Sequence, residues 1–153
     1  MKKIVALAAA VLVLPLMAGA DEYATTKDAE LMVHKAVQFL RKEGREKALE
    51  AFSDPKGRFA YRDLYIMVYD VNGKCVAHGQ KKERIGKSLI DDRDAGGKAF
   101  VRERIEIAKR HGKGWQDYRF QNPATGKIEL KTSYFEREGD LIIGCGAYKK
   151  QGG

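Results

Sequence analysis

A predicted β-hairpin in the middle of the chain constrains the fold more than any other feature. Residues 64–70 read Leu-Tyr-Ile-Met-Val-Tyr-Asp, which is apolar or aromatic on both faces of an extended strand. Such a strand is typical of the centre of a sheet, where both faces are covered. Asn72 and Gly73 follow, and this pair favours the positive φ angles of a tight hairpin turn. We therefore predict that residues 74–79 return antiparallel to residues 64–70.

The remaining segments show helical and strand patterns in a fixed order. Apolar residues recur at helical spacing after Thr25 or Thr26 and stop at Gly44. The other predicted elements are a short helix at 45–52, an irregular polar segment at 81–94, a helix at 98–111, and strands at 115–121, 127–137 and 141–148. Hairpin-type connections imply an antiparallel sheet, so we predict one α+β domain with the helices on one face.

The N-terminus has the layout of a cleavable secretory signal peptide. Lys2 and Lys3 precede an apolar run that contains Pro15, and small residues at 18–20 follow it. The apolar run is shorter than the roughly 20 residues that span a bilayer, which argues against a membrane anchor. We predict cleavage after Ala20, secretion or periplasmic location, and a single domain over residues 21–153.

Charge and motifs exclude several functional classes. The formal net charge is +8, but basic and acidic residues are interspersed along the chain, and no basic stripe with stacking aromatics is present. Nucleic acid is therefore not an expected partner. The sequence contains no nucleophile elbow, metalloprotease helix or phosphate-binding loop, so neither an enzyme nor a cofactor is predicted. Cys75 and Cys145 are compatible with a disulfide or with two buried thiols, and the sequence leaves both open.

Several short motifs, in chain order over residues 28–150, resemble single Cache domains. They are Asp63 to Asp70, Asn72-Gly73, Val76-Ala77-His78-Gly79, Ile85-Gly86-Lys87-Ser88-Leu89, Asp91 and Asp94, Gly97-Lys98, Gly114-Trp115-x-x-Tyr118, Asn122-Pro123-x-Thr125-Gly126, Lys131-x-Ser133-Tyr134 and Gly144-x-Gly146-x-Tyr148. The resemblance implies a PAS-like sheet of five antiparallel strands, a long N-terminal helix, and a helical connector between strands 2 and 3.

The resemblance also implies a function. Family members commonly bind small organic acids or similar metabolites in a pocket over the sheet. They are usually the outer part of chemoreceptors or sensor kinases. No signalling segment follows Gly153 in this sequence, so we expect a stand-alone sensor that binds its ligand freely or docks on a separate membrane receptor or sensor kinase.

Lys131 and His78 are the candidates for holding a carboxylate. Lys131 lies in the middle of a predicted strand, where lysine is unusual if that face is buried. Alternation with Lys127 and Glu129 favours the solvent face instead, and the resemblance of the Lys-x-Ser-Tyr block favours a binding role. His78 ends the second strand of the hairpin, where it either donates to a carboxylate with pH-dependent protonation or bonds a local carbonyl.

Aromatic and glycine residues complete the predicted pocket. Tyr65, Tyr118, Tyr134 and Trp115 each offer apolar surface with a polar tip, although aromatic residues on strands are usually core. Glycines 144 and 146 leave space on the last strand for a ligand or another backbone, and a β-bulge explains them equally well.

Calcium binding is the weaker alternative. Asp92 and Asp94, followed by two glycines and by Glu103, approach the spacing of an EF-hand loop. Gly96 brings no side-chain ligand at the fifth position, and the preceding segment makes a poor helix. The alternative to calcium binding is that these aspartates cap the following helix. A structural or interaction protein without a small-molecule ligand also stays open.

Overall fold

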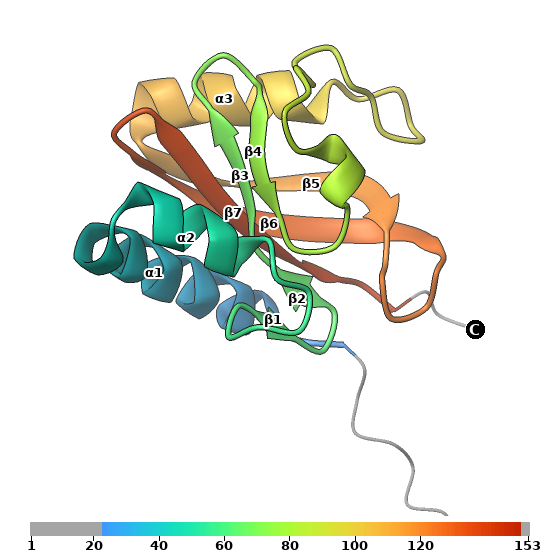
Figure 1. Cartoon of the computed structure of the whole chain (residues 1–153). Helices are drawn as coiled ribbons and strands as arrows, with labels where there is room; N and C mark the ends of the chain where they lie inside the picture. The colour runs from blue at the N-terminus through green and yellow to red at the C-terminus, as the bar shows by residue number, and fades with distance from the viewer. Residues whose placement is uncertain (1–22, 151–153) are drawn as a thin grey trace, which may run out of the picture.

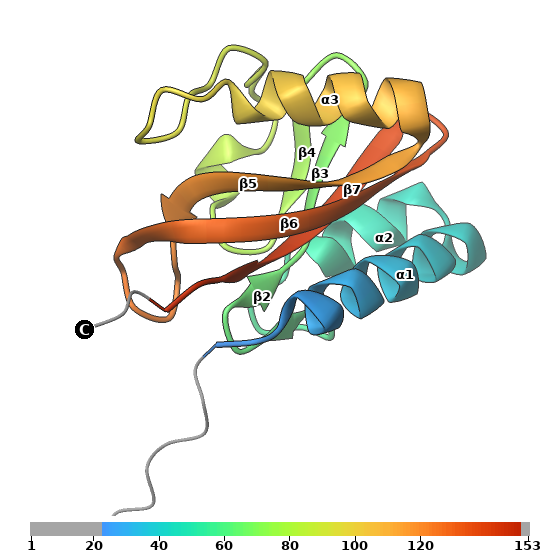
Figure 2. The same ribbon diagram turned by 180° about the vertical axis from the view of Figure 1, so that it is seen from behind.

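A five-stranded antiparallel sheet with helices on both faces forms the body of the protein (Figures 1 and 2). The computed structural model describes residues 23–150, and the predicted signal peptide lies outside the described residues. The helices are α1 (Thr26–Glu43), α2 (Arg45–Phe52) and α3 (Phe100–His111), with a 3-10 turn η1 (Lys82–Arg84). The strands are β1 (Ala60–Tyr61), β2 (Leu64–Tyr65), β3 (Met67–Asp70), β4 (Cys75–His78), β5 (Lys113–Gln121), β6 (Ile128–Glu138) and β7 (Leu141–Tyr148).

The sheet has the order β4-β3-β7-β6-β5, and every neighbouring pair is antiparallel. The α+β class, the five strands and the long N-terminal helix are as the sequence predicts. The expectation that all helices cover one face is wrong. Helices α1 and α2 pack on one face and α3 packs on the other, so each face has its own buried apolar cluster (Figure 2). Within residues 23–150, no helix has the length and apolarity required to cross a bilayer.

Helix α1 forms where the sequence predicts it, because a capping residue marks its start and a glycine marks its end. Thr25 and Asp28 make a capping box at the N-terminus, and Gly44 ends the helix with a φ of 85°. The buried stripe is made of small residues, including Ala29, Val33 and Ala36. Small side chains allow the helix to lie close to β7 and β6, which makes this face a dense apolar layer.

The predicted strand at 64–70 is divided in two. Residues 64–65 form β2, which pairs with β1 in a separate two-stranded ribbon, and residues 67–70 form β3 between β4 and β7. The central position predicted for the hairpin strand is therefore confirmed for β3 alone. Ile66 joins the two pieces, and the break leaves Tyr65 at the end of the sheet, beside the last residues of β7.

A β-bulge in the hairpin sets the direction of the β4 side chains. Val68 pairs with Ala77 and Tyr69 pairs with Cys75, which leaves Val76 as the extra residue. Paired residues share a face, so His78 lies with its partner Met67 on the α3 side.

The two cysteines are buried free thiols, so the disulfide alternative is wrong. Cys75 belongs to the apolar cluster beneath α3, whereas Cys145 belongs to the cluster beneath α1. The sheet itself separates the two sulfur atoms. Burial raises the pKa of Cys75 to about 11 and that of Cys145 to about 12.

We expect both thiols to be inert toward a thiol reagent in the folded protein. Burial excludes the reagent, and the raised pKa values keep the thiolate fraction very small at neutral pH. A colorimetric thiol titration should detect neither cysteine under native conditions and both in denaturant. Detection of neither in denaturant without reductant would instead indicate a disulfide and contradict the structure.

Candidate ligand-binding site

The ammonium of Lys131 lies in the protein interior without a hydrogen-bond acceptor. Its side chain is fully buried on the α3 face of β6, and Nζ has no hydrogen-bond partner among residues 23–150. Buried lysines are rare and are usually paired, because removing an ammonium from water costs several kcal/mol. Lys131 departs from this rule within residues 23–150.

Four aromatic rings from three strands surround this ammonium. Nζ lies 4.0 Å from the ring centroid of Tyr65, 4.9 Å from that of Tyr148, 5.7 Å from that of Phe120 and 5.9 Å from that of Tyr118. The negative ring faces attract a cation, which offsets part of its desolvation. The ammonium is therefore held in an aromatic cage that contains no carboxylate.

The hydroxyls at the edge of the cage form a fixed chain. The Tyr148 hydroxyl donates to the backbone oxygen of Gln121 at 2.7 Å, and the Tyr65 and Tyr148 hydroxyl oxygens are 3.0 Å apart. Since the single proton of Tyr148 is already used, Tyr65 is the donor in the second bond. This chain ties β2, β7 and β5 together around Lys131.

Gly146 makes room for the lysine side chain. It pairs with Ser133 on the neighbouring strand, and a Cβ at this position would lie 2.7 Å from Lys131 Cε and would also overlap the Ser133 hydroxyl. We predicted that the space at Gly146 would admit a ligand or another backbone. The side chain of Lys131 fills this space instead.

His78 borders the cage as a neutral donor. Its Nδ1 accepts hydrogen bonds from the backbone amides of Gln80 (3.2 Å) and Lys81 (3.0 Å), so the proton of the neutral ring is on Nε2. Its ring centroid is 5.0 Å from that of Tyr65. Burial, reinforced by Lys131 and Arg84, lowers the pKa of His78 to about 2. The His78 ring is therefore neutral across the physiological pH range in the unliganded site.

Two hydroxyls on the inner side of the cage have only weak partners. Tyr118 donates to the thioether sulfur of Met67 at 3.6 Å, and Ser133 donates to the Tyr118 oxygen at 3.4 Å. Burial alone raises the pKa of Tyr118, but Lys131 and Arg104 outweigh it and leave that pKa below its usual value. The lowered pKa is the expected effect of an uncompensated positive potential at this point.

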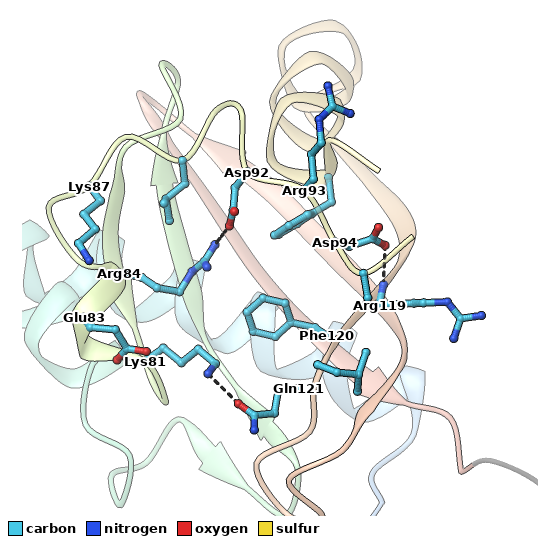
Figure 3. A pocket seen from close by; sticks show the side chains of 14 residues that line it. Lys81, Glu83, Arg84, Lys87, Asp92, Arg93, Asp94, Arg119, Phe120 and Gln121 are labelled. Carbon is cyan, nitrogen blue, oxygen red and sulfur yellow. Dashed lines mark hydrogen bonds and ion pairs between the residues drawn. The ribbon is translucent and has the colours of Figure 1, made fainter. Parts of the chain in front are cut away.

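A pocket of about 410 Å³ opens beside the cage, between β5 and the connector at residues 79–99 (Figure 3). Phe120 lines this pocket and also contacts the ammonium, so its ring separates the two. Arg84 lies over the same ring at 5.3 Å and pairs with Asp92 at 2.7 Å. The Lys81 ammonium donates to the Gln121 side chain at 2.8 Å, which closes the pocket on the side of Tyr65.

The structure gathers four of the six predicted site residues and separates the other two. Lys131, His78, Tyr65 and Tyr118 meet on the α3 face. Trp115 and Tyr134 are cross-strand partners on the opposite face, with ring centroids 5.0 Å apart. Tyr134 packs in the cluster beneath α1, and Trp115 is 43% exposed. Their place in the predicted pocket was wrong because strand alternation directs them away from it.

Sequence reasoning missed three residues of the site. Phe120 and Tyr148 border the ammonium directly; Phe120 alternates with Tyr118 on β5, and Tyr148 alternates with Gly146 on β7. Arg104 is fully buried on α3, next to Tyr118. A signal for it existed, since position 104 falls within the apolar helical stripe between Phe100 and Ala108.

The carboxylates of the calcium alternative do not converge. Asp92 pairs with Arg84, and Glu103 pairs with Lys98 at 3.0 Å. Asp94 accepts bonds from three backbone amides, including those of Lys98 and Arg119. In the part of the chain that the structure describes, no group of three or more metal-binding side chains is found. The aspartates organise the connector instead.

The family follows from comparison of the whole chain. The model of the family described as single Cache domain 2 matches residues 17–151. The chain belongs to this family. The resemblance stated from the sequence motifs is thereby confirmed, and the PAS-like sheet with its long N-terminal helix is the Cache fold.

Relatives of this Cache domain are sensory proteins. The sensor histidine kinase MctS of Rhizobium johnstonii is 33% identical over 89 residues, a match that covers 57% of this chain and 19% of the kinase. The Cache domain described here thus spans about a fifth of that kinase's length.

Solved structures share the fold. A methyl-accepting chemotaxis protein from Vibrio parahaemolyticus aligns with a TM-score of 0.70 at 23% identity, over 80% of this chain and 86% of its own. A Cache chemosensory domain described for carboxylic acid recognition aligns with a TM-score of 0.69 at 21% identity, over 82% and 93%. A third solved structure with this fold, described as the periplasmic sensor domain of a chemotaxis protein, aligns with a TM-score of 0.65 at 23% identity, over 82% of this chain and 90% of its own.

The neutral His78 is expected to make this Cache domain acid-sensitive. With a pKa of about 2 in the folded state and about 6.5 when unfolded, only the unfolded chain binds the proton between these values. The stability contributed by the neutral ring is present above pH 6.5 and is lost as the pH falls. From pH 7 to pH 5 we expect a loss of about 2 kcal/mol from this residue. Urea unfolding at both pH values should show a smaller loss in His78→Asn, whereas equal losses would contradict the assignment.

Replacing Gly146 is expected to disturb the lysine. The added methyl group of Gly146→Ala must displace Lys131 or shift β7, at about 1 to 3 kcal/mol in the free energy of unfolding. Gly96→Ala is the matched control, because the nearest atom there is the far end of the Asp94 side chain at 3.3 Å. Thermal unfolding of both variants measures the difference, and equal melting temperatures would refute the packing role of Gly146.

Proposed function

We propose that this chain is an exported sensor module that binds a small organic acid, with the ligand carboxylate held by Lys131. The observation that carries the proposal is the buried ammonium that has no hydrogen-bond acceptor in the described part of the chain. The proposal includes export and cleavage after Ala20, which the N-terminal pattern supports.

Electrostatics favours an anion over a neutral ligand. The unliganded cage keeps a charge away from water with only ring faces as partners. A carboxylate would supply both an opposite charge and acceptor oxygens, and a charge-assisted hydrogen bond is roughly twice as strong as a neutral one. A neutral ligand would leave the desolvation of Lys131 largely uncompensated.

Three further donors are available for the second carboxylate oxygen. The hydroxyls of Tyr118 and Ser133 have weak partners, and the neutral ring of His78 presents Nε2–H. The ring faces of Tyr65 and Phe120 provide the apolar surface for a short carbon chain. A few polar groups within an aromatic wall are typical of small-molecule sites.

The pocket provides the route of entry. A ligand entering between β5 and the connector would meet Arg84 first and would reach Lys131 when the Phe120 ring rotates (Figure 3). The Lys81 bond to Gln121 would strengthen the closure after binding. Movement of the connector against β5 is the conformational signal that we propose for this domain.

The relatives support this reading by analogy. One solved Cache chemosensory domain with the same fold is described for carboxylic acid recognition. The kinase relative suggests that a membrane receptor or sensor kinase receives the signal, and we propose such a partner for this chain.

A thermal-shift screen of short carboxylates with the wild-type protein tests the proposal. An acid that binds the folded state raises the melting temperature by mass action. Lys131→Met is expected to lose most of this shift for every active acid. It should fold at least as stably as the wild type, because it removes a buried charge that has no acceptor.

The matched control is Lys127→Met, which removes an exposed lysine just before the same strand. Its ligand-induced shift is expected to equal that of the wild type. A shift retained in Lys131→Met, or the absence of any shift across the acids tested, would overturn the proposal.

A further inference from the structure

A second buried cation lies close to the first. The Arg104 side chain is fully buried beneath α3, with its guanidinium carbon 5.1 Å from the ring centroid of Tyr118 and 5.5 Å from that of Tyr69. An arginine side chain remains charged at any physiological pH. Its partners are the side-chain oxygen of Gln116 at 3.1 Å and the sulfur of Met67 at 3.4 Å, while Nε has none among residues 23–150.

A count of charges shows how much positive charge is left over. The α3 face brings together Lys131, Arg104 and Arg84, and within residues 23–150 Asp92 is the carboxylate that forms an ion pair with one of them. Two further carboxylates are buried. Asp63 accepts from the backbone amides of Ala24 and Tyr148, and Glu129 accepts from the side chains of Tyr23, Asn122 and Thr125. Within residues 23–150 neither forms an ion pair with these cations, although Asp63 and Lys131 interact electrostatically. Lys131 and Arg104 therefore have no ion-pair partner in this part of the chain, so that a dianion could pair with both and a monoanion with one.

A flexible thioether contacts Arg104 and Tyr118, and the Tyr118 ring also borders Lys131. The Arg104 guanidinium and the Tyr118 hydroxyl both donate to the sulfur of Met67, which is a weak acceptor. Ser133 continues this row of donors toward Lys131. Methionine adapts its shape easily, so the sulfur can give way to a stronger acceptor.

The spacing limits the size of such a ligand. The Lys131 nitrogen is 5.9 Å and the Arg104 guanidinium carbon 5.1 Å from the centroid of the same ring, so the two groups are at most about 11 Å apart. A charge-assisted hydrogen bond of about 2.8 Å at each end leaves room for a short chain between the two carboxylates.

We propose that the ligand is a short aliphatic dicarboxylate, with one carboxylate on Lys131 and the other on Arg104 in the place of the Met67 sulfur. This inference rests on the proposed function and adds a second anchor to it. Arg104 thereby sets the preference for diacids, and Lys131 is required for all acids.

Succinate and butyrate form the matched pair of probes, because both have four carbon atoms and differ in one terminal carboxylate. Titration calorimetry of the wild-type protein is expected to show succinate binding at least about tenfold more tightly, the value of one charge-assisted contact. Arg104→Met should remove this preference by lowering succinate affinity to about that of butyrate. Arg104→Lys should keep most of it, because the charge is retained.

The control variant is Arg110→Met on the same helix, where the side chain is 68% exposed. It is expected to bind both acids like the wild type. Equal wild-type affinity for the two acids, abolished by Lys131→Met, would overturn the diacid inference and leave the proposed function intact. Binding of neither acid would overturn the diacid inference, and the wider thermal-shift screen would then decide the proposed function. If Arg104→Met does not fold, the wild-type preference and its retention in Arg104→Lys decide the question.

Discussion

The interior of this domain is organised around an ammonium that the protein itself does not neutralise. Lys131 is fully buried, its nearest contacts are ring faces, and a hydrogen-bond acceptor is missing in the described part of the chain. Such a charge opposes folding unless the rest of the molecule is stable enough to hold it. The apolar face beneath α1 and the aromatic rings around the ammonium allow the fold to tolerate the burial of this charge.

The two faces of the sheet differ in how many charged and polar side chains they bury. Small apolar residues of α1 pack closely on β7 and β6, and the cluster on that face is almost entirely apolar. The face beneath α3 contains Lys131, Arg104 and His78 among its aromatic residues. Because hydrophobic burial on the first face supplies stability, the second face can keep polar groups without partners, which is the usual condition of a binding site.

The site also shows how one charge determines the state of its neighbours. Burial and the positive charges of Lys131 and the arginines keep His78 neutral, whereas the charges of Lys131 and Arg104 lower the pKa of Tyr118 against the opposing effect of burial. The neutral His78 ring can donate through Nε2, and the Tyr118 hydroxyl donates to the Met67 sulfur. Gly146 contributes through its missing side chain, since the lysine lies across the space that a Cβ would fill.

The sequence by itself determined most of the elements and the family, and it singled out Lys131, the lysine that the structure buries. Apolar periodicity, the cap at Thr25 and the Asn72-Gly73 turn are local signals, and they predict helices and strands because local geometry depends on neighbouring residues. The tertiary structure alone decided which residues share a face. A break after Tyr65 and a bulge at Val76 shift the alternation, and strand register sends Trp115 and Tyr134 to the opposite side. Strand register, and the position of Arg104 and Lys131 beside the same Tyr118 ring, depend on contacts between segments far apart in the chain. No local sequence pattern records such contacts.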